Sequence, residues 1–487
     1  MNPALRRTGV VALVLLGALI LQVTWVQFFS HADYDRYDDN RTLFVEYEVP
    51  RGQILAGDVV IAQSLESPED SAYGYYRDYP EGDYFGNITG FKSMFRGSSA
   101  MEQAQDEVLN GTSSLFFLDE IGSTLTGEQR IGGNVSLTLD AELQKAAYDA
   151  LADAGVKGGA VVIDPRTGQI LAEASHPGWN PTGVSSNDYD SATESWNELT
   201  EDPDNPGLDR TRSDFYPPGS TFKTIVASAF IEGGHGDADT MVPAGNGYTA
   251  PDTTHEITNS SGQCPESELS LKEAFKRSCN TTFAALCVEE LSDEDIQEMA
   301  EAYGFDEEFE TPLPTQPSQT GDISADAFRA QACIGQQEVR ETVLQNTIIA
   351  ATIANGGERM SPQLIAEVTD SEGTTVKRGD EESAGRAISG STAEQMRELM
   401  QAVVDDGTGR NAQVSGFTVG GKTGTAEHSA EADGSEADHG WFHGWALNGE
   451  DEPVVAVCVF LDSYGDGASS KAAEISGDLM EQVLSAD

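Results

Sequence analysis

Three short motifs, far apart along the 487-residue chain, constrain its fold more than any other feature. They are Ser220-Thr221-Phe222-Lys223, Ser278-Cys279-Asn280 and Lys422-Thr423-Gly424-Thr425. Each motif alone is weak evidence, because such short patterns occur by chance in chains of this size. Taken in order, they supply the side chains that activate a serine nucleophile. A fold that uses them must bring three distant segments to one point.

Ser220 is expected at the N-terminus of a helix. Pro217-Pro218-Gly219 ends an extended segment, and residues 221–234 read as a helix that closes on two glycines. Lys223 then lies on the same helix face, one turn away. A lysine acts as a base only if its pKa is lowered by desolvation or by a second cation, for which Lys422 is the candidate. The alternative is a helix-capping serine beside a solvated lysine.

Ser278 and Asn280 lie between two predicted helices, residues 271–277 and 281–291. In a turn, a hydroxyl and an amide two residues apart can point into one cleft. The hydroxyl would relay a proton to a leaving amine, and the amide would hold a peptide group of the substrate. Alone the pair is weak, since serine and asparagine are ordinary turn residues.

Lys422 lies in a glycine-rich predicted strand, residues 417–426. Glycines such as Gly424 allow a ligand to approach the backbone closely. Lys422, Thr423 and Thr425 are candidates for binding a substrate carboxylate. The N–H of Thr425 would complete an oxyanion hole with that of the serine nucleophile. The alternative is an edge strand with a surface lysine.

The charge balance excludes some partners. The chain has 82 acidic and 28 basic residues, a formal charge of −54. Nucleic acid and anionic membrane surfaces need a basic face, so neither is expected as the main partner. The acidity fits either a highly soluble surface or adaptation to high salt, where like charges are screened.

The cysteines and histidines give no strong metal signature. The five cysteines show no metal-ligand spacing, and their odd number leaves at least one free. Cys264 and Cys279 would pair in an oxidising compartment; otherwise they are small buried apolar residues. His428, His439 and His443 leave a metal site open as a minor alternative. We predict no metal and no cofactor.

Residues 9–29 form an almost uninterrupted apolar run, long enough to cross a bilayer core of about 30 Å. Two arginines precede it and aspartates follow it, which places the N-terminus in the cytoplasm. We predict a cytoplasmic tail at 1–7, a transmembrane anchor at 8–29 and an extracytoplasmic remainder. A cleaved signal peptide is the alternative, although no clear cleavage site follows.

Beyond the anchor, residues 30–135 read as a small, polar, partly irregular module with extended stretches at 42–47 and 53–62. Residues 136–487 have a tighter pattern, which predicts an α+β domain. Asp140 and a capping box at residues 391–394 are expected to begin helices. One antiparallel sheet is expected to combine a hairpin with three later strands, flanked by helices. These strands are predicted at residues 159–164, 169–174, 417–426, 441–447 and 454–461.

With these residues in place, the chain resembles class B penicillin-binding proteins, the peptidoglycan D,D-transpeptidases, and most of all those of the actinobacterial PbpA type. The resemblance covers most of the chain beyond the anchor. It rests on the three motifs above and on several further segments. These are Arg51-Gly52-Gln53-Ile54, Leu137-Thr138-Leu139-Asp140, Asp164-Pro165, Thr167-Gly168, Tyr216-Pro217-Pro218-Gly219, Gly335-Gln336 and Gly407-Thr408-Gly409.

The resemblance implies a penicillin-binding transpeptidase domain on an N-terminal pedestal. Ser220 would attack a D-Ala-D-Ala stem peptide with Lys223 as base, Ser278 would assist the leaving amine, and β-lactams would acylate the same serine. Stem peptides, β-lactams and a SEDS-type glycosyltransferase are the implied partners, at the cell membrane. The pedestal departs most from the family, since Asp58 stands in a turn where Asp-Arg-Asn-Gly is common. Rival interpretations are a D,D-carboxypeptidase or β-lactamase, a β-lactam sensor, and a non-enzymatic cell-wall scaffold.

Overall fold

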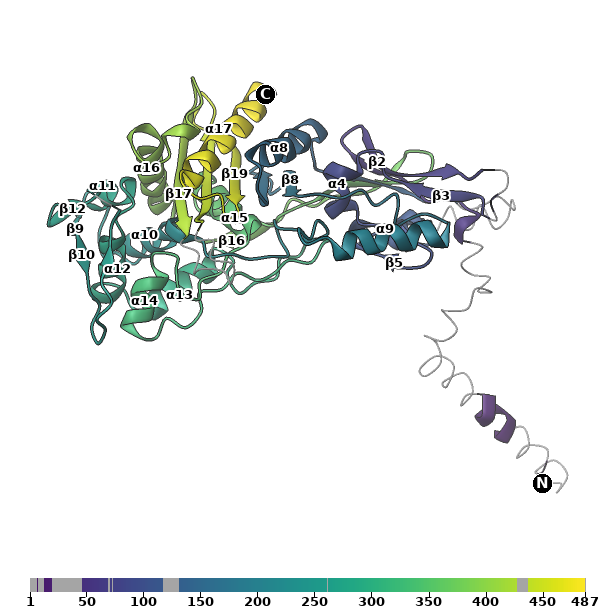
Figure 1. The fold of residues 1–487 in the computed structure, drawn as a ribbon, viewed down its shortest axis with the longest axis horizontal. Coiled ribbons are helices and arrows are strands. Elements are labelled where there is room, and N and C mark those ends of the chain that lie inside the picture. Colours follow the sequence, from purple (N-terminus) through teal and green to yellow (C-terminus); the bar gives the residue numbers. More distant parts are fainter. Residues whose placement is uncertain are drawn as a thin grey trace.

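The computed structural model describes residues 7, 13–19, 46–68, 71, 73–116, 131–260, 262–426 and 437–486. The described part is elongated, with the elements of the predicted pedestal at one end and the helices around Ser220 at the other (Figure 1). Most of the predicted anchor at 8–29 lies outside the described residues. Among those that are described, none belongs to a helix with the length and apolar character needed to span a bilayer.

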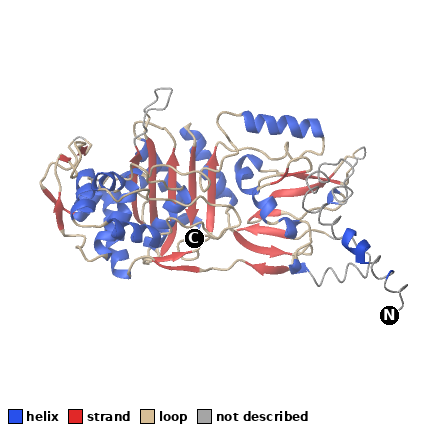
Figure 2. Ribbon diagram, turned by 90° about the horizontal axis from the view of Figure 1, so that it is seen from below, coloured by secondary structure: helices blue, strands red, loops and turns tan. Residues whose placement is uncertain are grey.

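The larger body is built on a five-stranded antiparallel sheet with the order β17-β18-β19-β7-β8. It joins the predicted hairpin to the three predicted C-terminal strands, so the α+β prediction is confirmed. In Figure 2 these strands run side by side across the middle of the molecule. The strands are β7 (Gly158–Ile163), β8 (Ile170–His176), β17 (Thr418–Ala426), β18 (His439–Leu447) and β19 (Pro453–Leu461).

Helices cover both faces of this sheet, and β19 shows why. Its alternate residues Ala456, Cys458 and Phe460 pack in the core that includes α15 (Val343–Ala354). The intervening valines pack with α8 (Ala141–Ala154) and α17 (Ala468–Ala486). A strand that is buried on both faces has apolar residues along its whole length, as residues 454–461 of β19 do.

Two predicted helix caps have different outcomes. The Asp140 side chain accepts a hydrogen bond from Leu143 N at the start of α8, as predicted. Helix α16 (Gly390–Asp406), which packs beside β17, begins one residue before the predicted capping box. Its N-cap is Ser389, whose hydroxyl accepts from Thr392 N, so the prediction of a cap at Ser391 was wrong.

The helices around Ser220 form the far end of this body, and they include those predicted at residues 221–234, 271–277 and 281–291. Small two-stranded sheets join them at the outer edge. The elements are η2 (Gly219–Phe222), α10 (Lys223–Glu232), β9 (Met241–Pro243), β10 (Gly247–Tyr248), β11 (Ile257–Thr258), β12 (Glu268–Ser270), α11 (Leu271–Lys276), α12 (Asn280–Glu289), α13 (Asp293–Ala302) and α14 (Asp326–Ala332).

A second, six-stranded sheet has the order β15-β14-β6-β1-β2-β3. The predicted extended stretch at 53–62 is a hairpin, in which β1 and β2 meet at a turn containing Gly57 and Asp58. Two of its strands come from residues 365–378, so the sheet draws on both sides of the predicted boundary at 135. The strands are β1 (Ile54–Ala56), β2 (Val59–Glu66), β3 (Tyr75–Asp78), β6 (Asn134–Leu137), β14 (Ile365–Thr369) and β15 (Thr375–Arg378).

A buried carboxylate holds the pedestal elements together. Glu102 is fully buried and pairs with Arg51 at 2.7 Å and Arg77 at 2.6 Å. Glu46 and Tyr47, at the end of the extended stretch predicted for 42–47, are helical; the rest of that stretch lies outside the described residues. The remaining elements are α4 (Gly82–Thr89), β4 (Lys92–Ser93), β5 (Gly97–Ser98), α5 (Ala100–Ala104), α6 (Asp106–Leu109), η1 (Ser114–Phe116), α9 (Tyr189–Glu201), β13 (Glu358–Met360), β16 (Ser383–Arg386) and η3 (Arg410–Ala412).

Candidate active site

Ser220 lies in a tight turn that two glycines make possible. The first turn, η2, is a 3₁₀ helix that leads into α10, so the predicted helix start is confirmed with a tighter first turn. Gly219 has a φ of 58° and donates its N–H to the carbonyl oxygen of Gly335 at 3.0 Å. A Cβ on Gly335 would lie 1.8 Å from the carbonyl oxygen of Gly219. Neither position tolerates a side chain without moving the serine.

Lys223 points at Ser220 from one turn along the helix. Its Nζ lies 2.9 Å from Ser220 Oγ. The same Nζ lies 2.8 Å from the carbonyl oxygen of Ser278 and 2.6 Å from Asn280 Oδ1. Lys223 is fully buried. The first and second motifs therefore meet at one ammonium group.

Ser278 and Asn280 are presented by the turn between α11 and α12. Ser278 has a φ of 61°, a left-handed conformation that is uncommon for a residue other than glycine. Asn280 is the first residue of α12, and its Nδ2 donates to the carbonyl oxygen of Thr258 at 3.0 Å. An uncommon backbone conformation held by surrounding contacts is typical of a functional turn.

The third motif completes the cluster from β17. Lys422 Nζ lies 3.0 Å from Ser278 Oγ and 2.9 Å from the carbonyl oxygen of Thr423. A Cβ on Gly424 would lie 2.6 Å from the carbonyl oxygen of Pro218, so the strand packs directly on the serine turn. Ser278 Oγ lies between the two lysines, 3.3 Å from Lys223 Nζ.

The electrostatics favour a neutral lysine beside the serine. Burial lowers the pKa of Lys223 well below its usual value, and the charge of Lys422 lowers it further. Burial alone lowers the pKa of Lys422 to about 7. Two ammonium groups that share a desolvated site cannot both stay charged at low cost. Lys223 is therefore the lysine that can accept the proton of Ser220.

A cleft of about 390 Å³ opens onto the serine. It is lined by Ser220, Ser278, Asn280, Thr423 and Thr425 among the predicted residues. Lys223 and Lys422 lie buried behind them, and Gly424 lies in the strand between Thr423 and Thr425. The cleft also contains residues for which sequence analysis predicts no role. These include His255, Glu256, Thr258, Ser260, Gln263, Gln331, Gln336, Thr408, Asp438 and Ser469.

Thr408 lies in a motif that is visible in the sequence, although the sequence alone predicts no function for it. It belongs to Gly407-Thr408-Gly409, and its Oγ1 lies 2.5 Å from Thr423 Oγ1. It therefore orients one of the predicted substrate-binding hydroxyls. His255, in a loop, and Ser469, in the first turn of α17, had no such signal, because only the fold brings them to the cleft.

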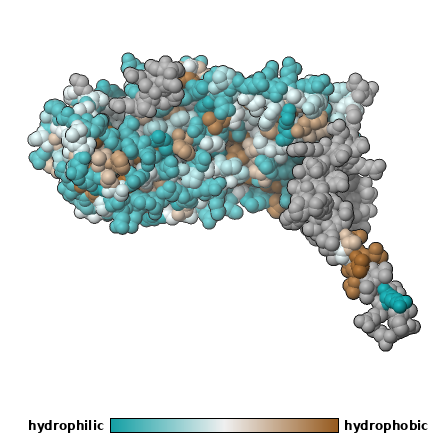
Figure 3. Space-filling view, turned by 60° about the horizontal axis from the view of Figure 1, so that its bottom comes forward, coloured by the Kyte–Doolittle hydropathy of each residue, from teal (hydrophilic) through white to brown (hydrophobic). Residues whose placement is uncertain are grey.

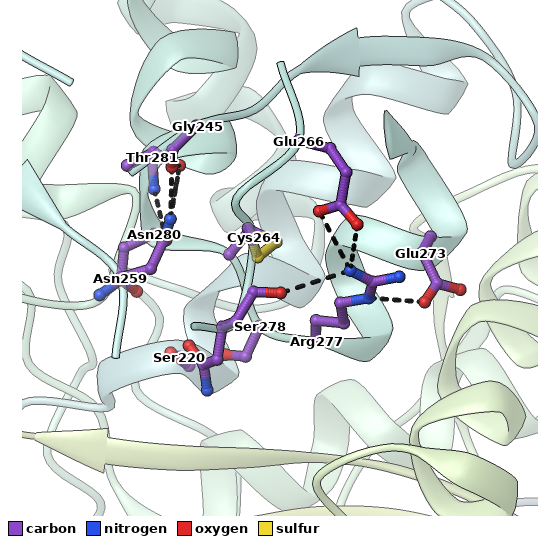
Figure 4. The surroundings of a disulfide bond; sticks show 12 residues. Ser220, Gly245, Asn259, Cys264, Glu266, Glu273, Arg277, Ser278, Asn280 and Thr281 are labelled. Carbon is purple, nitrogen blue, oxygen red and sulfur yellow. Dashed lines mark hydrogen bonds and ion pairs between the residues drawn. A yellow bond between two sulfur atoms is a disulfide. The ribbon is translucent and has the colours of Figure 1, made fainter. Parts of the chain in front are cut away.

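Two disulfides lie beside the cleft. Cys264 pairs with Cys279, the middle residue of the second motif, which decides between the two alternatives for these cysteines (Figure 4). Cys287 pairs with Cys333, a pairing that the sequence does not predict. Cys458 is free and buried in β19.

Two of the three histidines of the minor metal alternative, His439 and His443, make hydrogen bonds within the protein. His443 Nε2 lies 3.1 Å from Thr224 Oγ1, and its Nδ1 lies 3.2 Å from the carbonyl oxygen of Asn346. His439 Nδ1 accepts from Ser463 N at 3.0 Å. His428 lies outside the described residues. Within the described ranges, no group of three or more histidine, cysteine or acidic side chains is arranged to hold a metal ion.

Comparison with family models gives two matches. Residues 158–481 match the penicillin-binding protein transpeptidase domain. Residues 51–135 match the dimerisation domain of penicillin-binding protein A. The first match contains all three motifs, and the second covers most of the predicted pedestal.

Similar proteins extend over the whole chain. Peptidoglycan D,D-transpeptidase PbpA of Mycolicibacterium smegmatis is 34% identical over 498 residues, covering 100% of this chain and 99% of that protein. The protein of the same name from Mycobacterium tuberculosis is 34% identical over 496 residues, covering 100% of this chain and 99% of that one.

Solved structures of penicillin-binding protein A from M. tuberculosis have the same fold. Its ceftriaxone acyl-enzyme complex has a TM-score of 0.84 and 33% identity, covering 90% of this chain and 99% of that one. Its imipenem acyl-enzyme complex has a TM-score of 0.85 and 33% identity, covering 91% of this chain and 100% of that one.

Proposed function

The chain belongs to the class B penicillin-binding proteins of the PbpA type, and on this premise we propose that it is a peptidoglycan D,D-transpeptidase. In this proposal it cross-links stem peptides through an acyl-serine intermediate, and β-lactams acylate the same serine. The observation that carries the proposal is the convergence of the three motifs, with Lys223 Nζ 2.9 Å from Ser220 Oγ.

Acylation begins when neutral Lys223 takes the proton of Ser220. The serine oxygen attacks the carbonyl carbon between the two terminal D-alanines. The developing oxyanion is stabilised by the N–H groups of Ser220 and Thr425. As the C–N bond breaks, the proton passes from Lys223 through Ser278 to the leaving nitrogen, and D-alanine departs.

The substrate is held by groups on both sides of the cleft. Lys422, Thr423 and Thr425 bind the terminal carboxylate of the stem peptide, while Asn280 holds a peptide group further along the chain. Gly424 keeps the strand free of a side chain where it packs on the serine turn. In the second half of the reaction, the amine of another stem peptide attacks the ester, and Ser220 is released as the cross-link forms.

The remainder of the proposal concerns the cellular setting. The apolar run at 8–29 anchors the protein in the cell membrane, with the catalytic domain outside the cytoplasm. The module at 30–135 serves as a pedestal. A SEDS-type glycosyltransferase supplies the glycan strands, since the three motifs provide only acyl transfer.

The test is a donor peptide ending in D-Ala-D-Ala, incubated with the protein and an amine acceptor. Transpeptidation predicts free D-alanine and an equal amount of donor–acceptor product. Release of D-alanine with water as the sole acceptor would support a carboxypeptidase instead. Loss of both products in Ser220→Ala identifies the nucleophile.

A further inference from the structure

Helix α12 is covalently fixed at two points along its length. Cys279, its N-cap, is bonded to Cys264, and Cys287, near its C-terminus, is bonded to Cys333. The helix itself begins with Asn280, which contacts Lys223. The two bonds lead to different walls of the catalytic cleft.

The first bond leads to the wall formed by residues 255–260 and Gln263. His255, Ser260 and Gln263 line the cleft, and Cys264 follows directly. Figure 4 shows the Cys264–Cys279 bond beside Ser278, Arg277 and Asn280, close to Ser220. The bond therefore joins this wall to the turn that presents Ser278.

The second bond connects α12 to residues 331–336, which form another wall of the cleft and contact the turn that holds Ser220. Cys333 is the C-cap of α14, and Gln331, Ile334 and Gln336 around it line the cleft. Gly335, two residues beyond Cys333, accepts the hydrogen bond from Gly219 N. A shift of this segment would therefore move the backbone on which Ser220 stands.

Weaker contacts also cross these joints, and they show what each bond adds. Asn280 Nδ2 donates to the carbonyl oxygen of Thr258, and Arg277 Nη1 lies 3.4 Å from the carbonyl oxygen of Gln263. Arg329 Nε donates to the carbonyl oxygen of Cys287 at 2.7 Å. Single hydrogen bonds can break and reform, whereas a disulfide keeps the connected backbones within a fixed distance.

We propose that the two disulfides are positioning elements of the active site. They hold α12 between the wall of residues 255–260 and Gln263 and the wall of residues 331–336, in the geometry needed for acylation. All four sulfur-bearing residues are buried, with exposed fractions of 0 to 1%. They are therefore buried behind the residues that line the cleft rather than placed on the surface as an exposed redox switch. This inference rests on the proposed acyl transfer at Ser220.

The test compares the full chain with two double variants, Cys264→Ala with Cys279→Ala, and Cys287→Ala with Cys333→Ala. Cys458→Ala is the matched control, because this cysteine is also buried but unpaired and lies in the sheet. The measured quantity is the second-order rate constant for labelling by a fluorescent penicillin, determined across pH. Labelling stoichiometry reports the active fraction, so partial misfolding does not distort the rate constant.

We expect each double variant to be acylated about ten-fold more slowly, since misplacement by about 1 Å costs up to ~100-fold. Loss of the Cys264–Cys279 bond should also move the pH profile, because the Ser278 turn contacts Lys223 directly. A purely stabilising role would lower the unfolding temperature and leave the pH profile unchanged. Wild-type rates and pH profiles in both variants would overturn the inference.

If one double variant fails to fold, the labelling rate constant of the other double variant decides. Each bond can also be removed by a single replacement, Cys264→Ala or Cys333→Ala. Failure of the proposed function has a different signature. In that case the wild-type protein itself would not be labelled.

Discussion

Lys422 and Ser278 are 144 residues apart in the sequence, yet Lys422 Nζ lies 3.0 Å from Ser278 Oγ. This contact connects the strand β17 to the turn before α12. The same hydroxyl lies 3.3 Å from Lys223 Nζ. In the proposed mechanism, Ser278 is therefore the group through which a proton passes from Lys223 to the leaving nitrogen.

Removing that hydroxyl should impair acylation without unfolding the protein. Ser278→Ala and Ser278→Gly are both expected to reduce the rate of penicillin labelling by about 100-fold, the usual contribution of a proton-transfer group. Glycine also suits the φ of 61° at this position, so Ser278→Gly should be at least as stable as Ser278→Ala. Wild-type labelling rates in Ser278→Gly would remove the hydroxyl from the mechanism.

The pH dependence of acylation should be bell-shaped. The rate should rise with pH as Lys223, whose pKa is lowered by burial and by Lys422, loses its proton. It should fall as Lys422, whose pKa is about 7, loses the charge that binds the substrate carboxylate. In Lys422→Met the rising limb should shift to higher pH, because one cause of the lowered Lys223 pKa is gone. An unshifted rising limb would contradict the coupling between the lysines.

Lys422 should also affect stability in a pH-dependent way. Its pKa is about 7 in the folded protein, compared with about 10.4 in an unfolded chain. Between these values the unfolded state binds more protons, so folding stability contributed at this site rises with pH. Lys422→Met lacks this contribution, so the free energy of unfolding of wild type should increase relative to that of Lys422→Met by up to about 1.4 kcal/mol per pH unit above pH 7. Chemical denaturation of both proteins at pH 7 and pH 9 measures this difference. A difference that changes in the opposite direction would contradict the lowered pKa of Lys422.

The serine turn should depend on Gly335. Gly335→Ala combines a φ of 74° with a Cβ placed 1.8 Å from the carbonyl oxygen of Gly219. We expect at least a 100-fold loss in the acylation rate, since the backbone at Ser220 must move. Gly373→Ala is the matched control, with a φ of 85° and open space around its Cβ. It should cost about 1 kcal/mol of stability and leave acylation unchanged.

The formal charge of −54 predicts that salt stabilises the fold. Raising NaCl from 0.1 to 1 M shortens the screening length from about 10 Å to about 3 Å and weakens repulsion between surface carboxylates. The thermal unfolding temperature should therefore increase with NaCl. An unfolding temperature that is independent of NaCl would favour the simpler interpretation of a solvated surface.

The sequence was most informative where local signals were strong. Residues 454–461 form an unbroken apolar run, and β19 is buried on both faces. The Asp140 cap and the hairpin at β7 and β8 also carry local signals, and both were predicted. The three motifs pointed to side chains that the structure brings together, because each residue type has a specific task in the proposed chemistry.

The parts that the sequence missed depend on contacts between distant segments. Strands β14 and β15 pair with the pedestal sheet, although more than 220 residues separate β14 from β6. No local pattern reports such a pairing. The cap of α16 was misplaced because Ser389 and Ser391 are both suitable residues, and Ser389 also donates hydrogen bonds to the distant Glu232. Cys287 lies in α12 and Cys333 caps the end of α14, 46 residues further along, so their pairing could not be inferred.

The central claim is that Ser220 is the acylated residue. The most direct measurement is mass spectrometry of the peptide that contains Ser220 after incubation of the whole protein with penicillin G. The account predicts one penicilloyl adduct on Ser220 and none in Ser220→Ala. An adduct on another residue, or an unmodified wild-type protein, would contradict it.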